Sequence, residues 1–297
     1  MPKFRPAVRF VTVMVFLLVA AAVVGAALLP ATPGKSDPRT PASPVRVAVT
    51  TSWLECVLRD LTPDGMLAIT RLCPPGSCPG HFDMAPSAAR ELSEAAMVFL
   101  FDFQSAFADR LRGTSGADKS PSPVVLTGPG GVCVPDQYLA VSREVASALA
   151  ENDVITSESA REGVDRVAAR MKALGDDLRM RVKDAGLSGK PVAVAGHQKE
   201  FAEWLGLRPA VVFSGSDMQS PSAMESVILR AREAKVVLVV GNLQEGRQSA
   251  DAVARAVGVP VVVFGNFPHL TAKEPNFDTL VKNNADALVT AAAAAKL

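Results

Sequence analysis

Residues 192–205 read VAVAGHQKEFAEWL, and this stretch predicts the fold class. The small and β-branched apolar residues 192–195 predict a buried strand, and the amphipathic run from Gln198 to Leu205 predicts a helix. Only Gly196 and His197 separate the two. A strand that passes so directly into a helix is typical of a βα unit in a parallel sheet.

The same alternation extends in both directions along the chain. Helices are predicted between the strands at 52–61, where Ser52 is the expected cap, and at 86–95, 135–150, 198–205, 222–234, 249–257 and 276–295. Such alternation favours mostly parallel sheets with helices on both faces. Strands are expected at 45–49, 66–72, 97–101 and 124–126 in one half, and at 192–195, 210–213, 236–240 and 259–264 in the other.

One long helix is predicted between these halves, at residues 157–185. Its apolar residues recur at steps of three and four, which is the spacing of a helix with one buried face: Val164, Val167, Met171, Leu174, Leu178 and Val182. We therefore expect an α/β protein of two βα-type lobes with central parallel sheets, joined by one long rigid helix. The expected parts are an N-terminal lobe at 45–152, the linking helix at 153–186 and a C-terminal lobe at 187–297.

The N-terminus has the pattern of an export sequence. Lys3, Arg5 and Arg9 precede an uncharged apolar run at residues 10–29, which is typical of a signal peptide. A run of about 20 apolar residues is also long enough to span a bilayer. Residues 1–31 are thus predicted to be a signal peptide or an N-terminal membrane anchor, with residues 32–44 as a flexible linker. Both alternatives place the body in the periplasm or another extracytoplasmic space.

The overall composition argues against a nucleic-acid partner. Lys and Arg number 31 against 30 Asp and Glu, for a net charge of +1, whereas a nucleic-acid binder needs a basic excess. Aromatic residues make up only 5% of the chain, so a stacking groove for bases is not expected.

Four cysteines occur in the chain, at positions 56, 73, 78 and 133. An even number in an exported protein favours disulfides, for which three complete pairings are possible. Cys73 and Cys78 are closest in sequence and form the expected bridge. The alternative is that a cysteine of this segment binds a metal ion together with His81.

The chain has only three histidines, His81, His197 and His269, and each follows the end of a predicted strand. The carboxyl ends of strands form the ligand edge of an open α/β sheet. Because imidazole is the commonest neutral metal ligand, three histidines at such edges favour a metal site over three unrelated surface residues. Asp83 and Glu245 also lie in loops of the same edges. The alternatives are a helix-capping role for Asp83 and a solvated loop carboxylate for Glu245.

Two segments resemble a known family. The loop CPPGSCPGHFDMAPS at 73–87 is similar to the Pro-rich loop that carries the first metal-binding histidine in the TroA-like (cluster A-I) zinc/manganese substrate-binding proteins of ABC transporters. The segment GHQKEFAEWLGL at 196–207 is similar to a second family signature, in which a ligand histidine precedes an aromatic-rich helix. The predicted long helix resembles the rod that joins the family's two lobes.

The resemblance implies a monomeric, non-enzymatic receptor. It would capture a transition-metal ion, zinc first, in the cleft between the lobes and deliver it to a membrane permease. The family's middle histidine falls on Gly130, and no Asp occupies the position of its last ligand, near 265–269. Nitrogen and sulfur donors favour zinc over manganese. The expected metal ligands are His81, His197, His269 and Cys78, with Asp83, Glu245 and Asn266 as further cleft residues.

Two other functions remain compatible with these residues. The first is a receptor for a metal chelate or another small solute on the same fold, because the absence of the middle histidine enlarges the site. The second is a metal-dependent hydrolase, which would need an open three-histidine site with Glu245 as its base. A receptor binds its ligand without turnover, and this property separates it from the hydrolase.

Overall fold

The computed structural model describes residues 43–73, 85–107, 109, 121–215, 220–268 and 276–297. The chain divides into two compact units, Met1–Thr40 and Pro41–Leu297, and all the described residues belong to the second. Within these ranges no helix has both the length and the apolar character needed to cross a membrane. The apolar run at 10–29 lies outside them.

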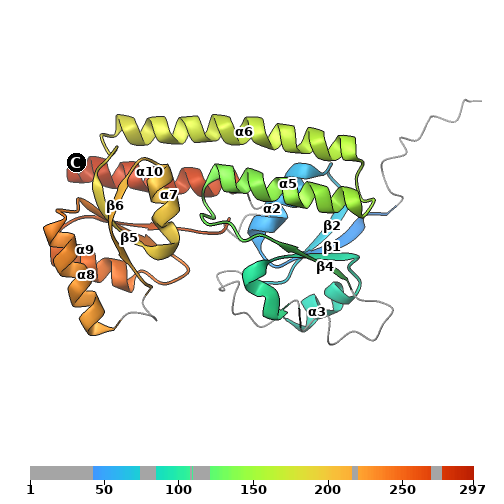
Figure 1. The fold of residues 1–297 in the computed structure, drawn as a ribbon, viewed down its shortest axis with the longest axis horizontal. Coiled ribbons are helices and arrows are strands. Elements are labelled where there is room, and N and C mark those ends of the chain that lie inside the picture. The colour runs from blue at the N-terminus through green and yellow to red at the C-terminus, as the bar shows by residue number, and fades with distance from the viewer. Residues whose placement is uncertain (1–42, 74–84, 108, 110–120, 216–219, 269–275) are drawn as a thin grey trace, which may run out of the picture. The chain divides into compact units, whose positions relative to one another are not determined.

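The fold contains two four-stranded sheets in which all the strand pairs are parallel (Figure 1). The strand orders, β2-β1-β3-β4 and β6-β5-β7-β8, are the same pattern used twice. The predicted α/β class with two parallel sheets is confirmed. Sheet A consists of β1 (Val45–Val49), β2 (Leu67–Arg71), β3 (Met97–Phe101) and β4 (Ser122–Leu126), and sheet B of β5 (Pro191–Ala195), β6 (Arg208–Phe213), β7 (Leu238–Asn242) and β8 (Val261–Phe264).

The helices lie between the strands as predicted, and their bounds agree with the sequence to within two residues at each end. The longest, α6 (Ser157–Asp184), has 28 residues, packs along α5 and contacts α10 (Figure 1). Two short 3₁₀ turns, η1 (Asp102–Gln104) and η2 (Gly196–Gln198), follow β3 and β5. The other helices that lie wholly within the described ranges are α2 (Ser52–Leu61), α3 (Pro86–Ser93), α5 (Pro135–Glu151), α7 (Lys199–Trp204), α8 (Pro221–Glu233), α9 (Gln248–Val257) and α10 (Phe277–Ala295).

The predicted cap of α2 is wrong by one residue. Thr51 has extended backbone angles, and its side chain accepts a hydrogen bond from the Leu54 amide at 3.2 Å, so Thr51 is the cap and Ser52 is the first helical residue. The Ser52 hydroxyl instead donates to the carbonyl of Pro268 at 3.2 Å. A residue expected to have a local role therefore contacts the loop that follows β8.

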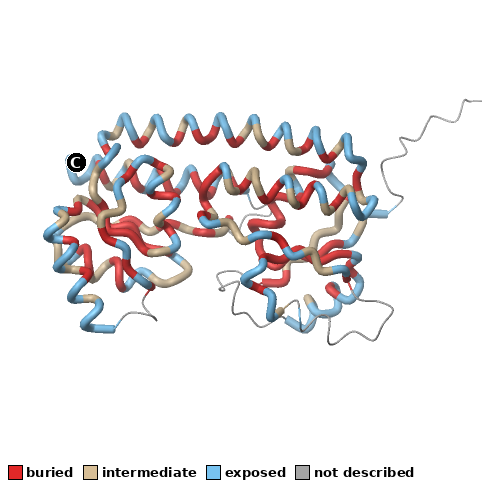
Figure 2. The backbone as a smooth tube through the Cα atoms, viewed as in Figure 1, coloured by how far each residue is buried: buried red, intermediate tan, exposed pale blue. Residues whose placement is uncertain are grey.

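Successive side chains of a strand point to opposite faces of its sheet. The central strands β1, β3, β5 and β7 are mostly buried, so each sheet has apolar side chains on both faces (Figure 2). Val47 and Val49 of β1 lie in the same core as Val192 and Val194 of β5, whereas Ala48 lies in a separate cluster beneath α3. The outer face of sheet B packs against α8 and α9 through a third cluster. The inner faces of both sheets thus share one continuous apolar core.

The start of the C-terminal helix is part of this shared core. Phe277, the first residue of α10, stacks on Tyr138 of α5 with ring centroids 4.1 Å apart and meets Trp53 of α2 edge-on at 6.1 Å. Buried aromatic pairs of this kind contribute about 0.5–1.5 kcal/mol beyond their area. α10 therefore connects sheet B, which it covers at β8, to the helices of the N-terminal half.

A polar network surrounds the same junction. Arg170 of α6 donates to both carboxylate oxygens of Asp60, and the Tyr138 hydroxyl donates to Asp60 at 2.5 Å. The Arg170 Nε also lies 3.3 Å from Asp278 Oδ1 in the first turn of α10. Burial raises the pKa of Asp278, and burial followed by the negative charge of Asp60 raises the pKa of Tyr138. The network joins four helices through one guanidinium group.

Candidate metal site

The carboxyl ends of β5 and β7 bring His197 and Glu245 together. In sheet B, β5 pairs with β6 on one side and β7 on the other, so the strand order reverses between β5 and β7. The loops at such a switch point diverge and leave room for a ligand. His197 lies in η2, directly after β5, and Glu245 lies three residues after β7.

The two side chains face each other across this edge. His197 Nε2 is 3.3 Å from Glu245 Oε1, and the imidazole is 70% exposed whereas the Glu245 side chain is 25% exposed. Glu245 Oε2 is buried and has no hydrogen-bond partner among the described residues. An accessible imidazole beside a carboxylate with unused acceptor capacity is suited to binding a cation.

Gly215, two residues beyond the strand next to β5, makes room for this carboxylate. A Cβ atom on Gly215 would lie 2.7 Å from Glu245 Cβ and 3.2 Å from its Cδ. Real Cβ atoms do not approach carbon so closely, so a larger residue at 215 would displace Glu245. The glycine therefore helps to determine where the Glu245 side chain lies.

Amide side chains form a buried layer beneath these groups. The Gln198 side chain donates to Asn266 Oδ1, and the backbone N–H of Asn266 donates to Gln244 Oε1 at 2.9 Å. The backbone N–H of Gln244 in turn donates to Asn242 Oδ1 at 2.9 Å. Within the part of the chain that the structure describes, Gln198 Oε1 and Asn242 Nδ2 are buried without partners. Asn266, the expected oxygen donor, thus uses its side chain within this layer; sequence reasoning missed Gln198 and Gln244, although each closely follows a predicted strand.

The loops of the two sheets contact each other at this edge. Cys133, just before α5, donates to the carbonyl of Gly265 at 3.1 Å, and Asn284 of α10 binds the same carbonyl and the Gly265 amide, both at 3.0 Å. Gly265 is the first residue of the segment 265–269, in which the family's last ligand, an Asp, is expected. The backbone of Gly265 is held by its hydrogen bonds to Cys133 and Asn284 and lies close to the Leu280 side chain.

Two neighbouring glycines before α5 differ in the space around them. A Cβ on Gly131 would lie 2.9 Å from Glu200 Cβ and 2.7 Å from Val134, so this loop packs tightly against α7. A Cβ on Gly130, the expected position of the middle histidine, would have nothing within 4 Å among the described atoms. The structure therefore leaves room for a side chain at 130.

The remaining expected ligands, His81, Cys78, His269 and Asp83, lie outside the described residues. In the ranges that the structure does describe, no group of three or more His, Cys, Asp or Glu side chains is placed to hold a metal ion. The structure thus brings together His197 and Glu245 from the predicted set. Ligation by the other residues stays a prediction.

The cysteine prediction needs a correction. Cys56 and Cys133 are buried and free, whereas each of the three complete pairings would place both in disulfides. Burial raises the pKa of the Cys133 thiol to about 12 and that of Cys56 further still, so both remain protonated and are poor metal ligands. Their apolar environment explains why they act as core residues. A bridge between Cys73 and Cys78 stays a prediction.

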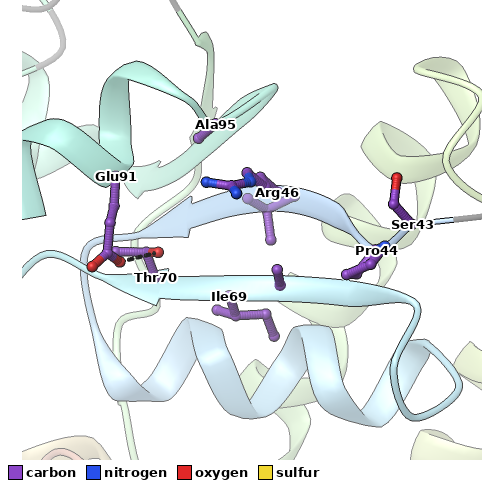
Figure 3. A pocket seen from close by; sticks show the side chains of 9 residues that line it. Ser43, Pro44, Arg46, Ile69, Thr70, Glu91 and Ala95 are labelled. Carbon is purple, nitrogen blue, oxygen red and sulfur yellow. Dashed lines mark hydrogen bonds between the residues drawn. The ribbon is translucent and has the colours of Figure 1, made fainter.

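Two cavities lie beside α3 rather than at the edge of sheet B. One, of about 490 Å³, is lined by residues that include Arg46, Ile69, Thr70 and Glu91 (Figure 3). The Thr70 hydroxyl donates to Glu91 at 2.7 Å across it. Its described lining includes neither histidine nor cysteine. The second, of about 420 Å³, includes Cys73 and the Glu55–Arg71 ion pair of 3.2 Å. Because Arg71 and Arg59 both pair with Glu55, this carboxylate is a weaker candidate for a cation than Glu245.

Comparison with known proteins identifies this architecture. Two parallel sheets of identical order, a long helix that contacts both halves and an imidazole at a sheet edge define a metal-binding substrate-binding protein of the TroA-like class. The sequence profile of the family described as "Zinc-uptake complex component A periplasmic" matches residues 133–291. The chain belongs to this family, whose members carry a ligand without changing it chemically, so the hydrolase alternative is wrong. No curated protein matches its sequence significantly.

Solved structures share the fold at low sequence identity. The crystal structure of ZnuA has a TM-score of 0.67 at 17% identity, and the match covers 84% of this chain and 100% of that chain. The Pseudomonas aeruginosa binding protein FpvC, in complex with Ni²⁺, gives 0.69 at 16% identity over 85% and 98% of the two chains. A Mn-bound periplasmic metal-binding protein from Candidatus Liberibacter asiaticus gives 0.66 at 13% identity over 84% and 99%. These likenesses support the fold.

Proposed function

We propose that this protein is an extracytoplasmic receptor of an ABC transporter, which captures a divalent transition-metal ion, zinc first, and delivers it to a membrane permease. The observation that carries the proposal is the His197–Glu245 pair at the switch point of sheet B, with Nε2 and Oε1 3.3 Å apart. Solved relatives named for zinc, nickel and manganese support a divalent cargo.

The proposed ligands are His197 together with His81 and His269. In the sequence His81 follows β2 and His269 follows β8, so both come after the carboxyl end of a strand, as His197 does. Three imidazoles match the ligands that zinc prefers. Cys78 is retained as an alternative ligand, because thiolate is also a zinc donor. The basic and apolar segment at 1–31 would direct export, either as a cleaved signal or as an anchor.

A zinc titration with elemental analysis tests this function, on the chain from residue 32 onward, which includes the whole compact unit Pro41–Leu297. We expect one tight zinc equivalent in the wild type and its loss in His81→Ala and His197→Ala. Equal zinc content in the two variants and the wild type would refute the proposed site. Absence of any tight equivalent in the wild type would refute the metal-ion receptor.

A metal chelate is a second candidate ligand, supported by one observation. A Cβ atom on Gly130 would have no described atom within 4 Å, so a site that includes this position is larger than one with a histidine there, and a chelate brings its own donor atoms. Titration with zinc alone and with zinc held in a small hydroxycarboxylate complex separates the two. Binding of the complex with release of the organic ligand supports the bare ion, whereas retention of the organic ligand supports the chelate.

A further inference from the structure

We propose that Glu245 is a metal ligand, and that this protein takes its carboxylate donor from the loop after β7. The inference rests on the proposed function, because it assigns a ligand of the same site. At the position after β8 where a family carboxylate is expected, the chain has Gly265, whose amide and carbonyl are both bound by Asn284. The expected position therefore offers no carboxylate, and Glu245 is the carboxylate that faces His197 on sheet B.

The distance between the two donors agrees with a shared ion. Zinc binds imidazole nitrogen and carboxylate oxygen at about 2.0–2.2 Å in a tetrahedral arrangement, which places two donors about 3.3–3.5 Å apart. His197 Nε2 and Glu245 Oε1 are separated by 3.3 Å. This separation is therefore compatible with one ion shared by His197 and Glu245.

The surroundings of Glu245 favour a cation at this position. Its Oε2 atom is buried without a hydrogen-bond partner among the described residues, and a buried acceptor left without a partner costs free energy. The nearby Arg247 is engaged by Asp251, with Nε and Nη2 at 2.8 and 3.0 Å from the carboxylate. In the described part of the chain, His197 is the basic side chain that contacts Glu245. A divalent ion bound here would give the Glu245 carboxylate a positively charged partner.

Gly215 helps to determine where the Glu245 side chain lies. Its missing side chain is what allows Glu245 to occupy its place, since a Cβ there would collide with Glu245 at 2.7 Å. The backbone of Gly215 is not in the left-handed region, so alanine is excluded by the carboxylate side chain rather than by backbone strain. The position of the Glu245 side chain therefore depends on a glycine at residue 215.

The test compares Glu245→Gln with Glu203→Gln, on the chain from residue 32 onward. Glutamine keeps the volume and hydrogen-bonding shape but removes the charge, and Glu203 is an exposed carboxylate of α7 that pairs with Lys199 at 2.9 Å. Affinity for zinc(II) ions is measured by competition with a chromophoric chelator. We expect Glu245→Gln to lose at least the roughly 10- to 100-fold typical of disturbed metal sites, with Glu203→Gln unchanged. Gly215→Ala should weaken zinc binding in the same direction.

The absorption spectrum of the cobalt(II)-loaded protein separates a ligand from a positioning residue. Replacing a donor changes the visible bands of bound cobalt, and we expect this change in Glu245→Gln but not in Glu203→Gln. Wild-type affinity and spectrum in Glu245→Gln would overturn the inference. If His197→Ala still abolished binding in that case, the proposed function would survive; a wild type without any zinc binding would overturn both.

Discussion

The two sheets share one strand order but differ in the chemistry of their carboxyl edges. In sheet A, the polar groups after β1 and β3 satisfy one another: Thr50 donates to Gln104 at 2.7 Å, and Asp102 accepts from two backbone amides. In sheet B, the described loops present an exposed imidazole and two buried acceptors without described partners, Gln198 Oε1 and Glu245 Oε2. Topology places both edges, and the side chains in each loop decide whether that loop can contribute to a ligand site.

This comparison separates two kinds of polar residue. A hydrogen bond that is complete within the fold contributes to the free energy of unfolding, whereas an acceptor left without a partner has capacity for a ligand. Substitutions at the described edge of sheet A should therefore lower the free energy of unfolding and leave zinc affinity almost unchanged. Substitutions of His197 and Glu245, at the edge of sheet B, should lower zinc affinity and leave the free energy of unfolding almost unchanged.

Substitution of His197 gives the largest expected effect. In His197→Ala, zinc affinity should fall by about 100-fold or more, which corresponds to about 2.7 kcal/mol. The apo protein should keep its free energy of unfolding within about 0.5 kcal/mol, because the side chain is 70% exposed. Competition titration and urea unfolding measure the two quantities. A lower free energy of unfolding together with unchanged zinc affinity in His197→Ala would contradict the assignment of the binding role to this edge of sheet B.

Gln104 provides the opposite case on sheet A. Its Oε1 accepts from the Thr50 hydroxyl and from the Phe101 amide at 3.1 Å. Gln104→Ala removes the acceptor of these two buried donors, so the free energy of unfolding should fall by about 2 kcal/mol. Zinc affinity should change by less than about threefold, since this residue is not at the switch point of sheet B. A binding defect as large as that of His197→Ala, in a variant that still folds, would contradict this assignment.

Gly130→His should increase the affinity of the protein for zinc. A Cβ atom at this position would have no described atom within 4 Å, so an added imidazole can begin there without collision. One further donor should raise zinc affinity by about tenfold, comparable with the effect of a well-placed supporting group. Gly131→Ala is the control, because its Cβ meets Val134 and Glu200 and should destabilise the protein without improving binding. Unchanged zinc affinity in Gly130→His would place residue 130 away from the site.

Much of the fold follows from the sequence because strands and helices depend on local periodicity. The apolar runs of β1 and β5 and the three-four spacing of α6 predicted their type and nearly their bounds. The site was less predictable, because its contacts join distant positions. Nothing local indicates that Gly215 makes room for Glu245, or that Asn284 holds Gly265. The cysteine count favoured disulfides, yet burial in the core determines the state of Cys56 and Cys133.

The smallest effect is expected for Cys133, which lies between the two edges. Its thiol donates to Gly265 and accepts from Asn284, and burial raises its pKa to about 12. The neutral thiol should therefore resist alkylation at about pH 8, below its raised pKa, in the folded protein and react once the chain is unfolded. Mass spectrometry after iodoacetamide treatment measures this, and Cys133→Ser should change the free energy of unfolding by about 1 kcal/mol or less. Rapid alkylation of the folded protein would mean that the contact between the edges opens, so that sheet B could then move independently of sheet A during zinc binding.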